Sequence, residues 1–212
     1  MKEYPKIQSL FKRDEKTHKF IIGQFSLPEF AYLQDNIWYW TEKIDGTNIR
    51  IDWGTGETDT GIPILSFGGR TDHAQMPPRL SARLHEIFTV DKFKSLYPET
   101  PMTLYGEGYG AGIQKGGGNY IPDSCDFILF DVMIDGWWLK QEDITDIALK
   151  LGINEVPFVS SGRLEYAIDQ VSSGLTSHFG DFQAEGIVLK SSIELRNRAG
   201  HRIITKMKTK DF

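Results

Sequence analysis

Two lysines near the end of the sequence, Lys206 and Lys208, have the spacing of an anion-binding pair. They fall in an expected strand over 202–208, in which a period of two puts both ammonium groups on one face and Ile203 and Met207 on the other. Two like charges side by side on a buried strand are unfavourable unless an anion lies against them. The pair therefore predicts a bound anion such as a phosphate group.

The lysine pair belongs to a basic segment within an acidic chain. Seven basic residues and one acidic residue, Glu194, lie between Lys190 and Lys210, which gives this segment a net charge of +6. The whole chain carries −5, so the remainder carries −11. A local basic patch can bind phosphates whatever the net charge of the chain. A solvated basic surface would have the same composition, and both interpretations stay open at this point.

A third lysine, Lys43, is a candidate nucleophile, because a lysine amine attacks electrophiles once its surroundings favour the uncharged form. It follows the apolar, strand-like run 37–42 and precedes Asp45-Gly46, a dipeptide typical of tight turns. In the next expected strand, 47–53, apolar residues alternate with polar ones. Taken alone, this segment could also be a structural hairpin with a charged edge.

The glycines are concentrated in one segment, where seven of the 21 lie between Gly106 and Gly118. A phosphate-binding P-loop needs serine or threonine after its lysine, whereas Lys115 is followed by glycine. A dinucleotide-binding fingerprint needs a helix to open there, which the glycine triplet after Lys115 opposes. We interpret the segment as a flexible loop after an expected strand, 102–107, with the carboxylate of Glu107 at its start.

The elements that must position these residues are mostly strands. β-branched and aromatic residues predict strands over 37–42, 47–53, 62–67, 102–107, 126–134, 184–191 and 202–208. Helical spacing joins Leu80, Leu84, Ile87 and Phe88, then Ile144, Ile147, Ala148 and Leu151 before Gly152, and finally Leu164, Ala167, Ile168, Val171 and Leu175. Strands follow one another rather than alternating with helices. We therefore expect an α+β fold, with antiparallel sheets and flanking helices in a single domain over 1–212.

Composition agrees with a globular protein, at 40% hydrophobic and 25% charged residues. No run of eighteen apolar residues occurs, which excludes a spanning helix, and the first residues lack the apolar core of a secretory signal. The single cysteine, Cys125, cannot form an internal disulfide and is expected to be packed in the core. We expect a cytoplasmic monomer that does not contact membranes.

Six short segments in order resemble the motifs of the covalent nucleotidyltransferase superfamily. Lys43-Ile-Asp-Gly-Thr-Asn48 is similar to the nucleotidyl-acceptor motif of DNA ligases, RNA ligases and mRNA capping enzymes. The later motifs are matched by Phe67-Gly-Gly-Arg70, Leu104-Tyr-Gly-Glu107, Asp126-Phe-Ile-Leu-Phe-Asp131, Glu185-Gly-Ile-Val-Leu-Lys190 and Ile204-Thr-Lys-Met-Lys208. Each motif alone is weak. Their common order, over most of the chain, is specific.

Within this superfamily the chain is most similar to the ATP-dependent RNA ligases of the RNA-ligase-2 type, because Tyr105-Gly-Glu is followed closely by Gly-Ile-Gln-Lys115. Asp45 stands where such ligases often carry histidine and where DNA ligases and capping enzymes carry aspartate. The alternatives are therefore an ATP-dependent DNA ligase, a capping-type guanylyltransferase and a non-catalytic module that binds nucleic-acid ends. Because the sequence stops soon after Lys208, we expect a minimal form without a C-terminal domain.

The resemblance implies a reaction in which Lys43 takes AMP from ATP, passes it to a 5′-phosphate end, and the end is sealed to a 3′-hydroxyl. Lys206 and Lys208 would supply positive charge to this chemistry. Nucleotide contacts are implied for Glu42, Asp45, Asn48, Arg70, Glu107, Phe130 and Glu185. Glu185 and Asn48 would also hold Mg²⁺, for which Mn²⁺ could substitute.

Three of these roles are more specific. Glu107 would accept hydrogen bonds from the ribose, Arg70 would bind ribose or phosphate, and Glu42 would flank the base. Phe130 would either stack on adenine or belong to the core, since the run around it is apolar. The expected partner is nucleic acid, with RNA favoured, contacted through the Arg196-Asn-Arg198 region or with the help of a protein partner.

Overall fold

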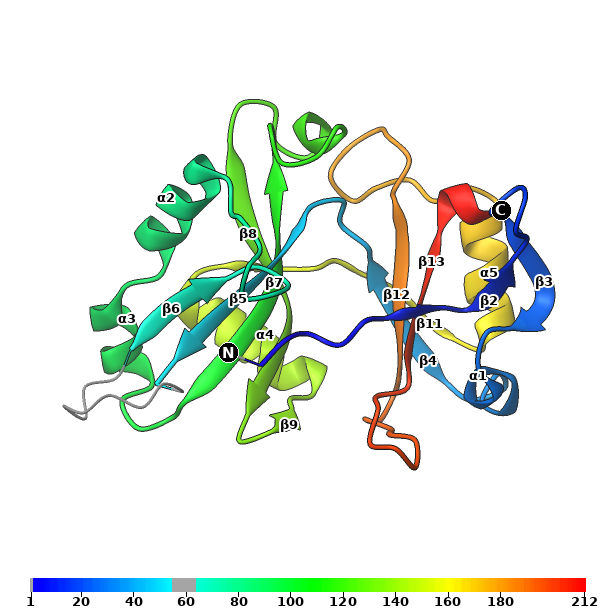
Figure 1. Ribbon diagram of the computed structural model, residues 1–212, viewed down its shortest axis with the longest axis horizontal. Helices are drawn as coiled ribbons and strands as arrows, with labels where there is room; N and C mark the ends of the chain where they lie inside the picture. Colours follow the sequence, from blue (N-terminus) through cyan, green and yellow to red (C-terminus); the bar gives the residue numbers. More distant parts are fainter. Residues whose placement is uncertain (1, 55–63) are drawn as a thin grey trace. The chain divides into compact units, whose positions relative to one another are not determined.

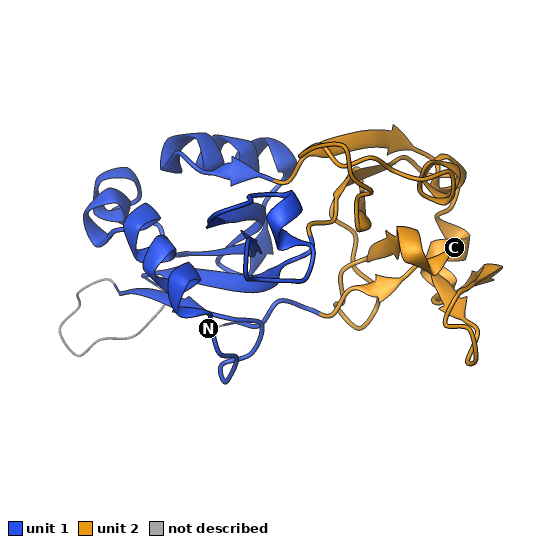
Figure 2. Cartoon of the chain, turned by 90° about the horizontal axis from the view of Figure 1, so that it is seen from above, with its two compact units in different colours: residues 1–5, 45–155 blue, residues 6–44, 156–212 orange. Residues whose placement is uncertain are grey.

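The computed structural model describes residues 2–54 and 64–212, which form two compact units (Figures 1 and 2). Unit 1 comprises Met1–Pro5 and Asp45–Glu155, and unit 2 comprises Lys6–Ile44 and Val156–Phe212. Each unit has its own sheet and its own hydrophobic core. The expected single domain over 1–212 stays a prediction.

Unit 1 contains a six-stranded sheet with the order β10-β8-β7-β5-β6 and with β9 paired to β8. The strands are β5 (Thr47–Trp53), β6 (Leu65–Gly68), β7 (Met102–Gly110), β8 (Cys125–Ile134), β9 (Trp137–Trp138) and β10 (Asn154–Glu155). The helices are α2 (Pro78–Ile87), α3 (Val90–Leu96), α4 (Gln141–Leu151) and the 3₁₀ turn η1 (Gly117–Asn119). The α-helices pack their apolar residues against one face of this sheet (Figure 1).

The faces of the unit 1 sheet follow the predicted alternation in β5. Ile49, Ile51 and Trp53 are buried in the core, so the intervening polar residues of β5 lie on the opposite face of the sheet, where Arg50 and Asp52 are also buried. The predicted helix stripe of α4 is also confirmed, and α4 ends at Gly152 in the left-handed conformation that glycine adopts most easily (φ 64°). Cys125 is buried, as expected.

Unit 2 contains a five-stranded sheet with the order β1-β13-β12-β4-β11 and a separate two-stranded sheet, β2-β3. The strands are β1 (Gln8–Ser9), β2 (Phe11–Arg13), β3 (Phe20–Phe25), β4 (Trp38–Glu42), β11 (Phe158–Gly162), β12 (Gly186–Ser191) and β13 (Ile204–Lys208). The helices are α1 (Pro28–Tyr32), α5 (Leu164–Ser172) and the 3₁₀ turn η2 (Thr209–Asp211). The predicted α+β class is confirmed, since all strand pairs are antiparallel except β1–β13 and β10–β8 among the described residues.

The alternative of a structural hairpin with a tight turn at Asp45-Gly46 is wrong. β4 and β5 belong to different sheets, and the chain passes from unit 2 to unit 1 between Ile44 and Asp45. Gly46 is required for a close approach, because a Cβ atom there would lie 2.3 Å from the carbonyl oxygen of Gly108. A dipeptide typical of turns therefore marks a crossing between two sheets.

The glycine-rich segment is also more regular than predicted. β7 continues to Gly110 instead of ending at Glu107. A Cβ atom on Gly106 would lie 2.2 Å from the Phe127 ring, so the glycine lets β7 and β8 pack closely. The segment after Gly110 contains the short turn η1.

Other elements differ at their ends or were not predicted. No expected element corresponds to β1, β2, β3, β9, β10, β11, α1 or α3, and β13 begins at Ile204. The expected strand 62–67 starts at positions 62 and 63, which lie outside the described residues, and β6 begins at Leu65. Within 2–54 and 64–212, no helix has the length and apolar character to cross a membrane.

Candidate active site

The candidate nucleophile Lys43 directly follows β4, where the sheet of unit 2 fixes its backbone. Its backbone N–H donates to the carbonyl oxygen of Gly186 at 2.9 Å. Its Nζ atom donates to Oε2 of Glu185 at 2.5 Å, and the side chain is 20% exposed. The ammonium group is thus held beside the start of β12 while part of it reaches solvent.

Glu185 joins this lysine to a second one. Its other oxygen, Oε1, lies 2.6 Å from Nζ of Lys208, and the Glu185 side chain is 14% exposed. The register of β12 and β13 places Gly186 opposite Lys208, which brings the two side chains together. One carboxylate between two ammonium groups leaves a surplus positive charge within this trio. Such a trio of partly buried charges favours an added anion.

Lys206 and Lys208 lie on one face of β13, as the spacing predicted, and Met207 is buried in the core of unit 2 on the other face. Ile203, expected beside Met207, precedes the strand and packs at the edge of that core. In the register of the sheet, Lys206 pairs with Val188, which pairs with Thr41. Lys206 therefore lies on the same face as Lys208 but two residues further from Glu185 along the strands.

The face of the sheet that carries Lys206 and Lys208 also carries Lys190, for which no role in the chemistry was predicted from the sequence. Lys190 pairs with Tyr39 on β4 and with Ile204 on β13, and its side chain is buried. The signal in the sequence was the period of two along 186–190, which puts Lys190 on the face of Val188.

Glu42 has a different environment from the one expected for a residue that flanks a base. Its side chain is buried and accepts hydrogen bonds from Ser177 Oγ at 2.6 Å and from the His178 backbone N–H at 2.8 Å. The His178 ring nitrogen Nδ1 lies 3.0 Å from the same carboxylate. Glu42 therefore ties β4 to the segment 174–184, and its contact with a base stays a prediction. Ser177 and His178 gave no signal in the sequence, since ordinary residue types 135 and 136 positions away revealed no pairing.

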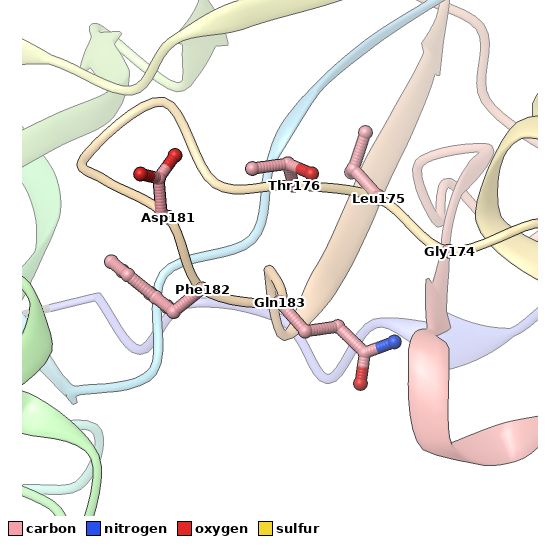
Figure 3. Close-up of a pocket in the computed structure, with 6 residues that line it drawn as sticks. All are labelled: Gly174, Leu175, Thr176, Asp181, Phe182 and Gln183. Carbon is pink, nitrogen blue, oxygen red and sulfur yellow. The ribbon is translucent and has the colours of Figure 1, made fainter.

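The segment tied down by Glu42 surrounds a hollow of about 380 Å³ (Figure 3). The hollow is lined by Gly174, Leu175, Thr176, Asp181, Phe182 and Gln183. None of these residues was predicted to take part in the chemistry. Within the described part of unit 2, two of the predicted residues, Lys43 and Lys208, instead contact a third, Glu185.

In unit 1, Asn48 and Glu107 lie side by side on neighbouring strands, on the face of the sheet opposite the core. They are directly opposite in the β5–β7 register. The Oδ1 atom of Asn48 is buried without a hydrogen-bond partner among the described residues. A buried oxygen of this kind has an unfilled place for a donor or a cation.

Phe130 lies at an irregularity of β8. The register jumps from Tyr105 opposite Asp131 to Gly106 opposite Leu129, so Phe130 is an extra residue in the strand. Its half-buried ring packs edge-on against Tyr4, with centroids 5.0 Å apart. Phe130 does not belong to the core cluster. Both alternatives for Phe130, stacking on adenine and packing within the protein, stay predictions.

Arg70 is exposed after β6, in a turn that the buried Arg50 holds in place. Arg50 Nε donates to the carbonyl oxygen of Gly69 at 2.6 Å, and its Nη2 donates to Asp72 at 2.8 Å. This hydrogen bond, with the charge of Arg50, lowers the pKa of Asp72 below its ordinary value. Arg50 thus supports the turn that presents Arg70.

Asp45 is held within unit 1 by the segment after β7. Its backbone N–H donates to Tyr120 Oη at 3.2 Å, and Gln114 Nε2 donates to the carbonyl oxygen of Gly46 at 3.1 Å. Neither Tyr120 nor Gln114 had been singled out for this role, although Gln114 belongs to the Gly-Ile-Gln-Lys115 segment that carried the resemblance.

Asn48 and Glu185, the two predicted metal ligands, each offer oxygen atoms of the kind that a divalent cation binds. No group of three or more His, Cys, Asp or Glu residues gathers within the described ranges. Mg²⁺ needs few protein ligands, because it keeps most of its waters and prefers oxygen. The orphan Oδ1 of Asn48 meets this preference. Glu185 also offers oxygens, but both now contact lysines, so a cation there would replace a lysine contact.

Comparison with known structures shows the same fold in an RNA ligase from Naegleria gruberi. An apo mutant of that enzyme matches with a TM-score of 0.66 and 16% identity, over 98% of this chain and 57% of that one. A mutant with ATP and Mn matches with a TM-score of 0.65 and 16% identity, over 97% of this chain and 57% of that one. The form with PPi matches with a TM-score of 0.65 and 17% identity, over 98% of this chain and 62% of that one. This chain therefore spans about three fifths of the length of those ligases.

Two comparisons of sequence give different results. No curated protein matches the chain. The sequence model described as RNA ligase matches residues 36–208, a range that contains Lys43, Glu185 and Lys208 and most of the chain. The chain belongs to the RNA ligase family.

Proposed function

We propose that this protein is an ATP-dependent RNA ligase that forms a lysyl-AMP intermediate on Lys43. The observation that carries the proposal is the trio of Lys43, Glu185 and Lys208, a nucleophile and a second cation held by one carboxylate. Membership of the RNA ligase family supports it. The Naegleria gruberi ligase is described with ATP and Mn and with AMP and Mn, which supports the same nucleotide and a divalent cation here.

In the proposed first step, the uncharged amine of Lys43 attacks the α-phosphorus of ATP. A nitrogen–phosphorus bond forms, the bond to pyrophosphate breaks, and the proton lost by the lysine passes to water. The AMP is then transferred to a 5′-phosphate end, and a 3′-hydroxyl displaces it to seal the strand. The nitrogen–phosphorus bond keeps the AMP activated between these steps.

Lys208 and Lys206 would stabilise the negative charge that develops on the phosphate oxygens. Lys208 is already held 2.6 Å from Glu185, so its charge is in place before a nucleotide binds. A divalent cation would add charge neutralisation at the phosphates, with Glu185 and Asn48 as its proposed holders. Glu185 would then exchange one lysine contact for the cation.

In unit 1 we assign nucleotide contacts to residues on the face of the sheet opposite the helices and in the adjoining turns. Glu107 would accept hydrogen bonds from ribose hydroxyls, and Phe130 would stack on adenine. Arg70, exposed after β6, would contact ribose or phosphate through its planar guanidinium group. Asn48 would bind phosphate or metal-bound water with its orphan oxygen. We also propose that Asp45 contacts the nucleotide, as the family resemblance implies.

RNA ends would be contacted by the hairpin extension between β12 and β13, residues 192–203 (Figure 1). Asn197 Oδ1 accepts the backbone N–H groups of Ala199 and His201, which closes the turn. Arg196 and Arg198 flank Asn197 and are exposed. Guanidinium groups presented two residues apart suit the repeating phosphates of a nucleic acid. A protein partner that helps to engage the RNA, a monomeric state and a cytoplasmic location stay predictions.

An ATP-dependent DNA ligase is the second candidate, and Asp45 is the residue that favours it. The test is a panel of nicked duplexes made of RNA, DNA or hybrids, with ATP and either Mg²⁺ or Mn²⁺. Sealing of RNA ends in preference to DNA supports the proposal. Sealing of DNA alone would replace it with the DNA-ligase alternative, and labelling by GTP instead of ATP would indicate a guanylyltransferase.

A further inference from the structure

The end of β13 is fixed by an ion pair with the N-terminal hairpin β2-β3, in which the carboxylate is buried and the guanidinium group is one third exposed. Asp211, in η2, is 1% exposed. Arg13, at the end of β2, donates to both of its oxygens, from Nη1 to Oδ1 at 2.7 Å and from Nη2 to Oδ2 at 2.6 Å. Two parallel hydrogen bonds between a guanidinium group and a carboxylate fix both position and orientation. Asp211 therefore occupies one defined place in unit 2.

Asp211 passes this constraint to the backbone of Lys208. Its Oδ2 atom accepts the backbone N–H of Lys208 at 3.2 Å. The next residue, Thr209, donates its N–H to the carbonyl oxygen of Glu185 at 2.9 Å and its hydroxyl to that of Ala184 at 2.8 Å. A lysine side chain is long and flexible, so the place of its backbone decides which atoms its ammonium group can reach.

The guanidinium group of Arg13 is itself held by several neighbours. It lies 5.3 Å from the centre of the Phe20 ring, and Phe20 packs edge-on against Phe212 at 5.4 Å. Nη2 also donates to Ser9 Oγ at 3.1 Å. Ser9 belongs to β1 and lies opposite Lys206 in the sheet. The pair is thus part of a packed arrangement that adjoins both lysines of β13.

We propose that Arg13 and Asp211 are positioning residues for Lys208 in the formation of lysyl-AMP. They act through the backbone at Lys208 and hold its ammonium group at Glu185, 2.6 Å away, beside the nucleophile Lys43. This inference rests on the proposed function of the trio. A fixed charge stabilises a transition state best when it needs no rearrangement, so the rate of the chemical step depends on this anchor.

Removing the guanidinium group leaves a carboxylate that is 1% exposed without its charged partner. The segment 208–211 must then shift to let water or another cation reach Asp211. A shift of about 1 Å in a catalytic group costs up to about 100-fold in rate. We expect Arg13→Ala to lower kcat for lysyl-AMP formation by about 10- to 100-fold, with a smaller change in KM for ATP.

A double-mutant cycle tests the proposal. The rate of label transfer from α-labelled ATP to the full chain is measured for the wild type, Arg13→Ala, Lys208→Ala and the double variant. If Arg13 acts through Lys208, Arg13→Ala lowers the rate in the wild-type background and causes little further loss in Lys208→Ala. Equal fold losses in both backgrounds would show a general structural role and overturn the proposal.

Two controls keep the result interpretable. Lys12→Ala removes an exposed cation from the same strand and should label at the wild-type rate. Arg13→Lys keeps the charge but cannot form two parallel hydrogen bonds, so it serves if Arg13→Ala does not fold. An intermediate rate in a variant with the wild-type melting temperature supports positioning. A wild-type rate in Arg13→Lys would overturn it.

The same measurements separate this inference from the proposed function. If the wild type takes no label, the proposed function fails, and the positioning role fails with it. If the wild type is labelled and Arg13→Ala is labelled at the same rate, only the positioning role is overturned.

Discussion

Lys208 and Lys210 lie two residues apart but differ in what their side chains contact. The Lys208 ammonium group is 2.6 Å from Glu185, whereas the Lys210 side chain is exposed in η2. We predict that Lys208→Ala lowers the rate of self-adenylylation by about 10²- to 10³-fold, because a fixed cation is lost where charge develops. Lys210→Ala, which removes a charge from the same segment, should change the rate less than about twofold. Single-turnover labelling with ATP measures both.

Equal rates in Lys208→Ala and Lys210→Ala would show that only the summed basic charge of the segment matters. In that case, the specific contact with Glu185 would have no catalytic meaning.

Glu42 is the buried carboxylate next to the nucleophile, and its effect should appear first in stability. Ser177 Oγ and the backbone and ring of His178 surround it. Glu42→Gln removes the charge that strengthens these hydrogen bonds, so we predict a loss of about 1–3 kcal/mol in the free energy of unfolding. The exposed Glu165 in α5 supplies the control, since Glu165→Gln should change the free energy of unfolding by less than about 0.5 kcal/mol. Urea unfolding compares the two variants, and equal stabilities would contradict the anchoring role.

At the scale of the element, glycines set how closely the strands of unit 1 pack. A Cβ atom on Gly106 would lie 2.2 Å from the ring of Phe127 and 2.3 Å from the carbonyl oxygen of Ile128. Gly106→Ala should therefore destabilise the protein by about 1–3 kcal/mol, since backbone atoms cannot move aside without disturbing the pairing of β7 and β8. Gly118→Ala is the matched control, because no atom lies within 4 Å of its added Cβ.

Thermal or urea unfolding of the two alanine variants decides this point. If Gly118→Ala cost as much as Gly106→Ala, the loss would come from the backbone freedom of glycine and not from the close approach of the strands.

The basic hairpin extension is the second element with a separable effect. We predict that the Arg196→Ala/Arg198→Ala double variant binds RNA more weakly. The slope of log K for RNA binding against log salt concentration should become shallower by up to about two units, because the binding of RNA releases fewer counterions when two phosphate contacts are lost. Self-adenylylation should stay at the wild-type rate. Filter binding at several salt concentrations measures the slope. A steep slope retained in the double variant would place the RNA contacts elsewhere.

A control for this variant is Lys12→Ala/Lys16→Ala, which removes two exposed cations from the β2-β3 hairpin. Its salt slope should equal that of the wild type. A slope reduced to the same extent would mean that RNA responds to the total charge and not to the hairpin extension.

At the scale of the whole molecule, periodic patterns predicted the local structure well. The alternation of Ile49, Ile51 and Trp53 gave the buried face of β5, and the spacing of Lys206 and Lys208 gave their shared face on β13. Both predictions succeed because a side chain's face depends on the local backbone period alone. Family membership was likewise evident from the order of the motifs.

The predictions that failed depended on which strands pair, and local patterns do not contain that information. Asp45-Gly46 looks like a hairpin turn, yet β4 and β5 join different sheets. The contacts of Glu42 with Ser177 and of Asp211 with Arg13 span 135 and 198 positions in the sequence. Such pairs arise only once the sheet of unit 2 brings distant segments together, so residue types alone did not reveal them.

The central claim is that the RNA ligase chemistry of this chain begins with a covalent bond between Lys43 and AMP. The most direct measurement is peptide mapping by mass spectrometry after incubation with ATP and Mg²⁺ or Mn²⁺. We predict AMP on the peptide that contains Lys43, with the acid lability of a phosphoramidate, and no adduct in Lys43→Ala. AMP on another lysine, such as Lys206 or Lys208, or an unmodified wild-type chain would contradict the account.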